Sequence, residues 1–236
     1  MSLLVSSWEN YNQWNQRNKT MSRAWIIPLR DWILKNIPAS AHKDSSSSKN
    51  LLDYGCSHFD LGLELEKHFQ SLHGFDINEA VIDTNIALYK DQKTFRFFSK
   101  INQIPQGNYD VIVAASVFQY FQTEHLAREF FKQAKSFFKP GIPAQLIVTD
   151  LIPPDYSPAR DAIENLMYSF VIGAPIAMLI HLFKAATKPK ELQLRRYSLD
   201  EFTRLANSEG FQVEKLEKNL TPSRRRYSCL LTMETE

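Results

Sequence analysis

Two carboxylates lie at the ends of short apolar runs, where a strand would end and the chain would turn. Asp53 lies in the run 51–54 and is followed by Gly55, and Asp76 follows the run 71–75, 21 residues beyond Gly55. A glycine after a strand lets the chain turn sharply and lets backbone N–H groups approach a ligand. A carboxylate at the tip of the next strand can accept hydrogen bonds from both hydroxyls of a ribose. The spacing therefore indicates a site for a nucleoside.

An alternating fold is needed to bring these residues together. Apolar runs typical of strands lie at 51–54, 71–75, 94–98, 109–115 and 145–149, with helical patterns at 61–69, 79–89 and 124–138. Strands that alternate with helices predict a parallel sheet covered on both faces, and right-handed crossovers make it doubly wound. Ligands of such α/β sheets bind beyond the carboxyl ends of the strands, where both carboxylates are expected.

The C-terminal part follows a different pattern. A helix is predicted over 198–208, with Ser198 and Glu201 as a capping box and Gly210 as its stop. Strand-like runs follow at 211–216 and 227–233 without a helix between them. Adjacent strands that lack a crossover helix pair antiparallel. The sheet is therefore expected to close with an antiparallel pair at one edge.

The first 38 residues are rich in aromatic side chains and predict two helices. Trp8, Tyr11 and Trp14 share one face of the first, and Trp25, Leu29, Trp32 and Ile33 share one face of the second. The polar stretch 39–50, with serines at 45–48, is typical of a linker. Residues 1–38 either pack on the core 51–236 or form a helical lid over its site.

Composition limits the function classes. The chain has 236 residues and a net charge of +2, which gives little reason to expect nucleic acid as the main partner. Two cysteines, Cys56 and Cys229, fit neither a disulfide framework nor a metal site, so a reducing compartment is expected and no metal is. No secretory signal is visible, and a cytoplasmic protein is expected. With only 7 glycines, any glycine-rich phosphate loop must be degenerate.

Five segments follow one another between Leu51 and Met233. They are DYGCSHF at 53–59, GFDIN at 74–78, NYDVIVAASVFQYF at 108–121, FFKPGIPAQLIVTDLIPP at 137–154 and RRYSLDEFTRLANSEGFQV at 195–213. In this order they resemble the class I S-adenosylmethionine-dependent methyltransferases of the small-molecule type. The resemblance implies a Rossmann-like, doubly wound, seven-stranded sheet with an antiparallel C-terminal edge strand. It also implies S-adenosylmethionine as the cofactor.

The resemblance assigns nine residues to this cofactor. Asp53, Gly55 and Ser57 would line its methionine half, Asp76 its ribose, Ile77 and Ser99 its adenine, and Ala115, Ser116 and Tyr120 would lie beneath the sulfonium. The family's loop usually carries three glycines, and here Ser57 and Phe59 replace two of them. We expect the Phe59 ring to narrow the pocket. Where the family often has an acidic residue after the third strand, this chain has Phe98, Ser99 and Lys100.

Methyl transfer from a sulfonium is an in-line displacement, so a protein contributes position and a dry site. A hydroxyl or amine acceptor also needs a general base, whereas a carboxylate or activated carbon does not. The candidate bases are His58, His125, Tyr168 and His181, and the sequence does not choose among them. Tyr11, Trp14, Asp150, Tyr168 and His181 are the candidate substrate contacts. For Asp150, a carboxylate that stabilises a turn is the alternative.

Residues 155–196 are expected to form a helical substrate cap. Within them, 166–183 contains 18 residues without a formal charge. A pair of cap helices broken at 173–175, an element on a membrane surface, and a membrane span all fit this run. Basic residues downstream favour the membrane surface over the span, through a peripheral contact of residues 166–196. The first two interpretations favour an apolar acceptor: a lipid, an isoprenoid, a polyketide or a peptide-like metabolite.

Three other classes compete with this interpretation. A nicotinamide-dependent oxidoreductase would need G-x-G-x-x-G after the first strand, but Ser57 and Asp60 occupy the second and third glycine positions. A non-catalytic binding subunit and an RNA methyltransferase remain alternatives, the latter disfavoured by the modest charge.

The run 224–226 is either a solvated arginine edge or a site that captures an acidic substrate.

Overall fold

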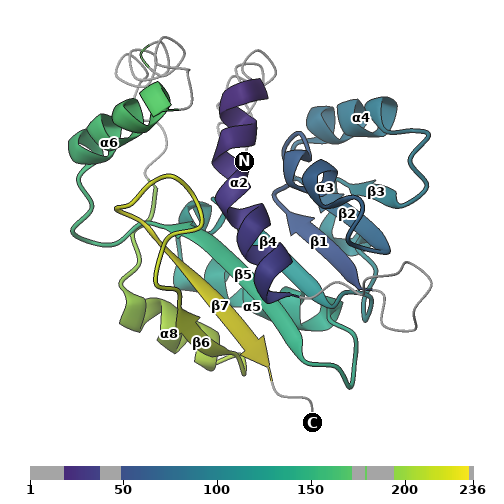
Figure 1. Ribbon diagram of the computed structural model, residues 1–236. Coiled ribbons are helices and arrows are strands. Elements are labelled where there is room, and N and C mark those ends of the chain that lie inside the picture. Colours follow the sequence, from purple (N-terminus) through teal and green to yellow (C-terminus); the bar gives the residue numbers. More distant parts are fainter. Residues whose placement is uncertain (1–18, 38–48, 172–178, 180–193, 234–236) are drawn as a thin grey trace.

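The computed structural model describes residues 19–37, 49–171, 179 and 194–233. Seven strands form one sheet in the order β3-β2-β1-β4-β5-β7-β6 (Figure 1). The strands are β1 (Asn50–Tyr54), β2 (Ser71–Phe75), β3 (Phe95–Phe98), β4 (Val111–Ala115), β5 (Ala144–Leu151), β6 (Gln212–Lys215) and β7 (Tyr227–Met233). The helices are α2 (Lys19–Asn36), α3 (Asp60–Leu65), α4 (Glu79–Leu88), α5 (Glu124–Phe137), α6 (Pro158–Val171) and α8 (Leu199–Asn207). The doubly wound fold expected from the sequence is confirmed.

The antiparallel strand is β7, the last in the chain, as expected. It pairs with β5 on one side and with β6 on the other, so β6 rather than β7 is the outermost strand. The side chains explain this order. β7 is largely buried, which suits a strand covered by two neighbours, whereas the four residues of β6 are mostly exposed. A short polar strand at the edge leaves little template for aggregation.

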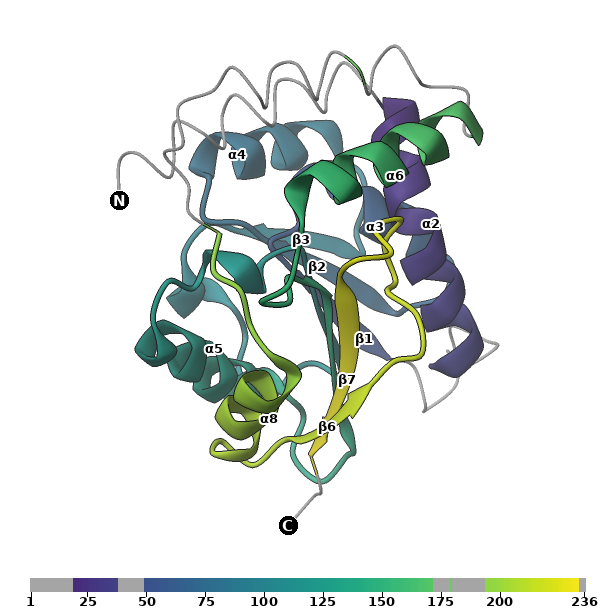
Figure 2. The same ribbon diagram turned by 90° about the vertical axis from the view of Figure 1, so that its left-hand side faces the viewer.

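The sheet separates two apolar clusters. One lies against α5 and α8 and is rich in aromatic rings, among them Phe118, Phe131 and Phe202. The other lies against α2, α3 and α4. Figure 2 shows α5 and α8 on one side of the sheet and α2 and α3 on the other. Because β4 and β5 are apolar and buried on both faces, they contribute side chains to both clusters.

Local signals explain where α5 and α8 begin. Thr123 caps α5 by accepting a hydrogen bond from Leu126 N, and Ser198 caps α8 by accepting from Glu201 N at 3.1 Å. Only half of the capping box predicted for α8 forms, because the Glu201 carboxylate accepts from Arg195 at 2.5 Å instead of from the backbone N–H of Ser198. The helix expected over 61–69 is shorter than predicted and ends as α3 at Leu65.

The helix predicted around Trp25 and Trp32 is α2, and its Leu29 and Ile33 are fully buried against the sheet. The helix expected at Trp8, Tyr11 and Trp14 lies outside the described residues. So do most of the linker and the segments 172–178 and 180–193. Among the helices that the structure describes, none combines the length and the apolar character needed to cross a bilayer.

Both cysteines are buried free thiols. Cys56 lies in the loop after β1 and Cys229 lies in β7. Burial raises the pKa of the Cys56 thiol well above its ordinary value, and it raises the pKa of Cys229 to about 12. A protonated, inaccessible thiol is a poor nucleophile. The two cysteines are therefore structural residues of the core.

The arginine run 224–226 is not a solvated edge. Arg226 is largely buried, and its guanidinium lies 2.6 Å from Asp150 and 3.5 Å from Asp161. Arg225 pairs with Glu164 on α6 at 2.7 Å. The interpretation as a solvated edge required all three arginines to be exposed, but only Arg224 is. The ion pairs link the start of β7 to the end of β5 and to α6.

Removing one partner of a buried ion pair leaves the other charge without compensation. We expect Arg226→Ala to lower the free energy of unfolding by about 3–5 kcal/mol. Arg224→Ala, two residues away on the surface, should change it by less than about 0.5 kcal/mol. Urea titration of the three proteins measures both effects. Equal stability of the two variants would contradict the buried network.

Candidate functional site

The carboxyl ends of the parallel strands form the candidate site. The loops after β1, β2 and β4 lie at this end of the sheet, and α6 lies across the same end in both views (Figures 1 and 2). In an open α/β sheet this is where ligands bind. The residues predicted from the sequence as cofactor contacts lie in these loops.

The loop after β1 is held onto the end of β2. Gly55 N and Cys56 N both donate to the carbonyl oxygen of Phe75, at 2.7 and 2.9 Å. Ser57 N donates to Oδ2 of Asp76 at 3.0 Å. Three consecutive amides therefore fix the loop, and one of them orients the carboxylate that was predicted to bind ribose.

Every second residue of this loop has a left-handed backbone. Gly55, Ser57 and Phe59 have φ angles of 84°, 46° and 61°. These are the three positions at which the resembling family usually carries glycine, so the loop keeps that conformation with two larger residues. Such a backbone is strained for residues other than glycine, and the surroundings must hold it. Asn85 does so at Ser57, because its Nδ2 donates to the Ser57 carbonyl at 2.7 Å.

Sequence reasoning missed Asn85. It is fully buried in α4, between apolar positions that include Ile82. A buried amide needs a hydrogen-bond partner, so an asparagine on the apolar face of a helix was the signal in the sequence that could have identified this residue. The partner itself, a strained carbonyl 28 residues earlier in the chain, could not be inferred from spacing.

The Phe59 ring points into the core and does not narrow the pocket, so that expectation is wrong. It packs edge-on against Phe95 and Phe97, with ring centroids 5.1 and 4.8 Å away. The space comes from two glycines on other elements. A Cβ at Gly62 would lie 2.2 Å from the Phe59 ring, and one at Gly74 would lie 3.0 Å from it. The loop has phenylalanine in place of a glycine, and two glycines elsewhere in the fold leave the space that its ring occupies.

Two buried carboxylates face each other at the ends of β1 and β2. Asp53 is 4% exposed and accepts no hydrogen bond from any residue in the described part of the chain. Burial, with the charges of Asp76 and Asp60, raises the pKa of Asp53 to about 7. Burial also raises the pKa of Asp76, opposed by the N–H donors of Asn78 and Ser57. Such a pair favours a ligand that brings donors or positive charge.

The ends of β4 and β5 are joined by side chains. Ser116 and Asp150 both have left-handed backbones, and Ser116 Oγ donates to Asp150 Oδ2 at 2.8 Å. Asp150 also accepts from Arg226 at 2.6 Å and from Thr221 at 2.8 Å. With these partners, Asp150 resembles the turn-stabilising carboxylate of the sequence interpretation. Its substrate contact stays a prediction that would require one partner to leave.

The remaining predicted contacts lie at or after the carboxyl ends of β2, β3 and β4. Ile77, just after Asp76, is 56% exposed and offers an apolar surface. Ser99, Ala115 and Tyr120 are half-buried at the ends of β3 and β4. Gln119 is buried beside Tyr120, and its Oε1 has no hydrogen-bond partner in the described part of the chain. The sequence interpretation did not select Gln119, whose amide oxygen is available to a donor.

The chain matches a family described as a methyltransferase domain over residues 21–216. It belongs to that methyltransferase family. No curated protein matches the sequence.

Solved structures resemble the whole methyltransferase chain in fold. Magnesium protoporphyrin IX methyltransferase from Synechocystis PCC 6803, crystallised with bound SAH, has a TM-score of 0.57 and 14% identity over 96% of this chain and 93% of its own. A SAM-dependent methyltransferase from Aquifex aeolicus has a TM-score of 0.54 and 15% identity, over 90% and 92%. An O-methyltransferase family protein from Burkholderia thailandensis has a TM-score of 0.52 and 16% identity, over 88% and 59%.

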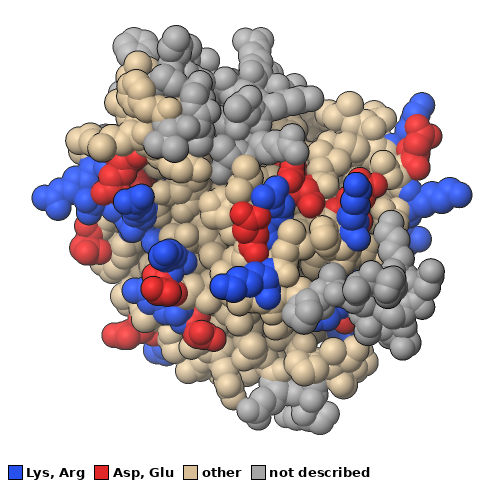
Figure 3. All heavy atoms as spheres, in the orientation of Figure 1, with Lys and Arg blue, Asp and Glu red and all other residues tan. Residues whose placement is uncertain are grey.

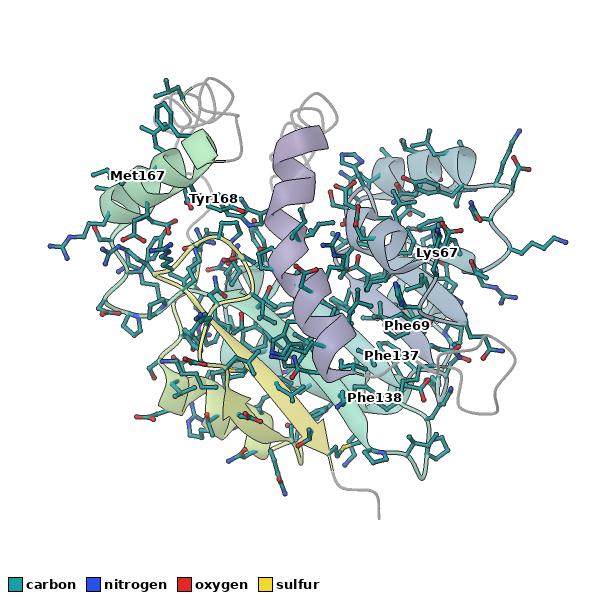
Figure 4. The ribbon with its side chains drawn as sticks, viewed as in Figure 1. Lys67, Phe69, Phe137, Phe138, Met167 and Tyr168 are labelled. Carbon is teal, nitrogen blue, oxygen red and sulfur yellow. The ribbon has the colours of Figure 1, made fainter. Side chains whose placement is uncertain are left out.

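The candidate bases of this methyltransferase lie in different places. His58 is half-buried in the loop after β1, where its charge lowers the pKa of Asp76. His125 is exposed in the first turn of α5. Tyr168 is half-buried on the side of α6 nearer to α2 (Figure 4). His181, Tyr11 and Trp14 lie outside the described residues. No three metal-ligating side chains cluster within the described ranges.

A cavity of about 450 Å³ opens at the opposite end of the sheet, lined by Ser71, His73, Lys93 and Arg96 among others. His73 is buried in its wall, and its ring nitrogens contact Ser71 Oγ at 3.0 Å and Tyr109 OH at 2.7 Å. Burial lowers the pKa of His73 to about 4. This neutral, fully partnered histidine belongs to the framework of the methyltransferase.

The close contact between Gly62 and the Phe59 ring predicts that a larger residue at position 62 destabilises the protein. An alanine in a helix is normally more stable than glycine, but Gly62→Ala should cost about 1–3 kcal/mol because its methyl group overlaps the Phe59 ring. In a Phe59→Leu background the same change should cost less. A double-mutant cycle by urea unfolding measures this coupling, and strictly additive effects would contradict it.

Asp53 predicts a pH dependence. Its pKa is higher in the folded chain than the ordinary value of 3.8, so it favours folding at low pH and destabilises the protein as pH rises to about 7. Asp53→Asn cannot ionise and should be more stable than the wild type above pH 7, by on the order of 4 kcal/mol. Urea midpoints on both sides of that pH measure the difference.

The exposed Asp83→Asn serves as the control, since it should leave the pH profile of stability unchanged. A wild type and an Asp53→Asn variant with parallel pH profiles would show that Asp53 ionises normally.

Proposed function

We propose that this methyltransferase binds S-adenosylmethionine at the ends of β1 and β2 and transfers its methyl group to a small, apolar acceptor. The observation that carries the proposal is the pair Asp53 and Asp76. Both carboxylates are buried at the ligand-binding end of the sheet, and among the described residues none donates a hydrogen bond to the Asp53 side chain. S-adenosylmethionine offers the missing complements, because it carries two ribose hydroxyls and an ammonium group.

The residues present fit this cofactor. Asp76 keeps acceptor capacity for the ribose hydroxyls after receiving one N–H at each oxygen. Ile77 supplies an exposed apolar surface for the adenine. Asp53 and the loop residues Gly55 and Ser57 would line the methionine half. When bound, the cofactor supplies a methyl group on a positively charged sulfur.

The contribution of the protein is position and exclusion of water. Ala115, Ser116 and Tyr120, which follow β4, would form the floor beneath the reacting sulfur. The Ser116–Asp150 hydrogen bond would hold that floor rigid. If the acceptor is a hydroxyl or an amine, the candidate general bases among the half-buried residues are His58 and Tyr168. His125, exposed on α5, is a weaker candidate.

An apolar acceptor is supported by the composition of the cap. The run 166–183 has no formal charge, and the described part of the cap carries large apolar side chains, of which Met167 and Phe170 are exposed. A thermal-shift screen that compares apolar and polar compounds tests this part separately. Stabilisation by polar compounds alone would exclude the apolar class.

Cofactor binding is tested by calorimetry with S-adenosylmethionine and its demethylated product. Asp76→Asn removes the charge but keeps the shape, and the loss of charged hydrogen bonds should weaken binding by about 100-fold. Asp83→Asn, an exposed aspartate in α4, is the matched control and should bind like the wild type. Absence of binding by the wild-type protein would favour the alternative of a non-catalytic binding subunit.

A further inference from the structure

Helix α6 has its polar side inside and its apolar side outside. Asp161 and Ser169 are buried on the inner face. Ile163, Met167 and Phe170 recur at spacings of four and three, which place them on one face, and they are 60%, 67% and 65% exposed. A surface helix of a globular protein normally turns its apolar stripe toward the core. The arrangement in α6 is the reverse.

Hydrogen bonds and ion pairs hold α6 in this orientation. Asp161 accepts from Tyr156 OH at 2.6 Å, from Ser223 Oγ, and from Arg226 at 3.5 Å. Asn165, one turn later, donates to the same carboxylate at 3.2 Å. Turning the helix to bury its apolar stripe would strip a buried charge of its partners, at a high cost. The apolar stripe is therefore fixed toward the outside.

Basic side chains border the stripe. Arg160 is exposed on the same face, one turn before Ile163. Arg224 is exposed next to Arg225, which pairs with α6, and the exposed Arg196 donates to the carbonyl oxygen of a proline that precedes the helix. In Figure 3 the surface where α6 lies is largely uncharged, with charged side chains below it. Asp155 is an exposed acidic residue nearby.

We propose that the outer face of α6 docks on an anionic lipid surface. Ile163, Met167 and Phe170 would enter the interface between headgroups and acyl chains, and the neighbouring arginines would pair with lipid phosphates. This deepens the proposed function, on which it rests for the apolar acceptor, because α6 lies at the same end of the sheet as the candidate site (Figure 2). An acceptor dissolved in the membrane would then reach the site directly.

A second copy of the chain fits this face less well. In a two-fold dimer the same patch meets itself, so the basic side chains that border it in both copies would be brought into one contact. Like charges at a contact disfavour association. The stripe of three apolar side chains is also small beside the roughly 20–30 residues that a stable interface uses on each side. An anionic lipid surface can both accept the apolar side chains of the stripe and pair with the arginines that border it.

Co-sedimentation of the full chain with vesicles tests the proposal. We expect binding to vesicles of phosphatidylcholine with phosphatidylserine, weaker binding to phosphatidylcholine alone, and weakening at high salt. Met167→Glu should reduce the apparent affinity about tenfold or more, because it places a negative charge in the apolar stripe. Leu88→Glu is the matched control, since Leu88 on α4 is 66% exposed against 67% for Met167.

Unfolding midpoints and cofactor calorimetry accompany both variants, so that loss of fold or of cofactor binding is separated from loss of docking. Equal vesicle binding by Met167→Glu and Leu88→Glu would overturn the proposal, as would absence of binding by the wild type. Light scattering supplies the remaining outcome. A wild-type dimer that Met167→Glu converts to a monomer would assign the face to a second copy instead.

Discussion

The carbonyl oxygen of Phe75 accepts two hydrogen bonds from the loop after β1, and the site depends on this contact. Gly55 N and Cys56 N converge on it, which forces the chain to leave β1 in a left-handed turn. The turn then directs Ser57 N to Asp76, so one contact sets both the loop and the carboxylate of β2. A buried carbonyl with two donors is fully satisfied and costs little to keep dry. The remainder of the site is arranged around it.

A single buried arginine stabilises the other half of the site in a similar way. Asp150 and Asp161 share Arg226, so a single guanidinium neutralises a carboxylate at the tip of β5 and another on the inner face of α6. The fold thus joins the end of β5 to α6 through buried ion pairs. Buried charges require defined geometry, whereas apolar surfaces tolerate sliding. The rotation of α6 about its own axis is consequently fixed.

The sequence was sufficient for features that local patterns encode. Strand β2 and the position of Asp76 follow from an apolar run and its end, and the cap of α8 follows from Ser198. It was insufficient where two distant elements decide together. The direction of the Phe59 ring depends on Gly62 and Gly74, which contact the ring only after folding. Arg226 looked solvated because its partners lie 65 and 76 residues away. The antiparallel strand was foreseen, but its place inside β6 depends on exposure along both strands.

The two buried cysteines have a practical consequence. Both thiols are shielded from solvent and have raised pKa values, so neither forms a thiolate at neutral pH. The native chain therefore behaves toward maleimide or iodoacetamide reagents as though it had no cysteine. A single new cysteine on the surface would carry a fluorophore or a spin label at one known position. Distances across this methyltransferase become measurable in solution without removing any residue of its core.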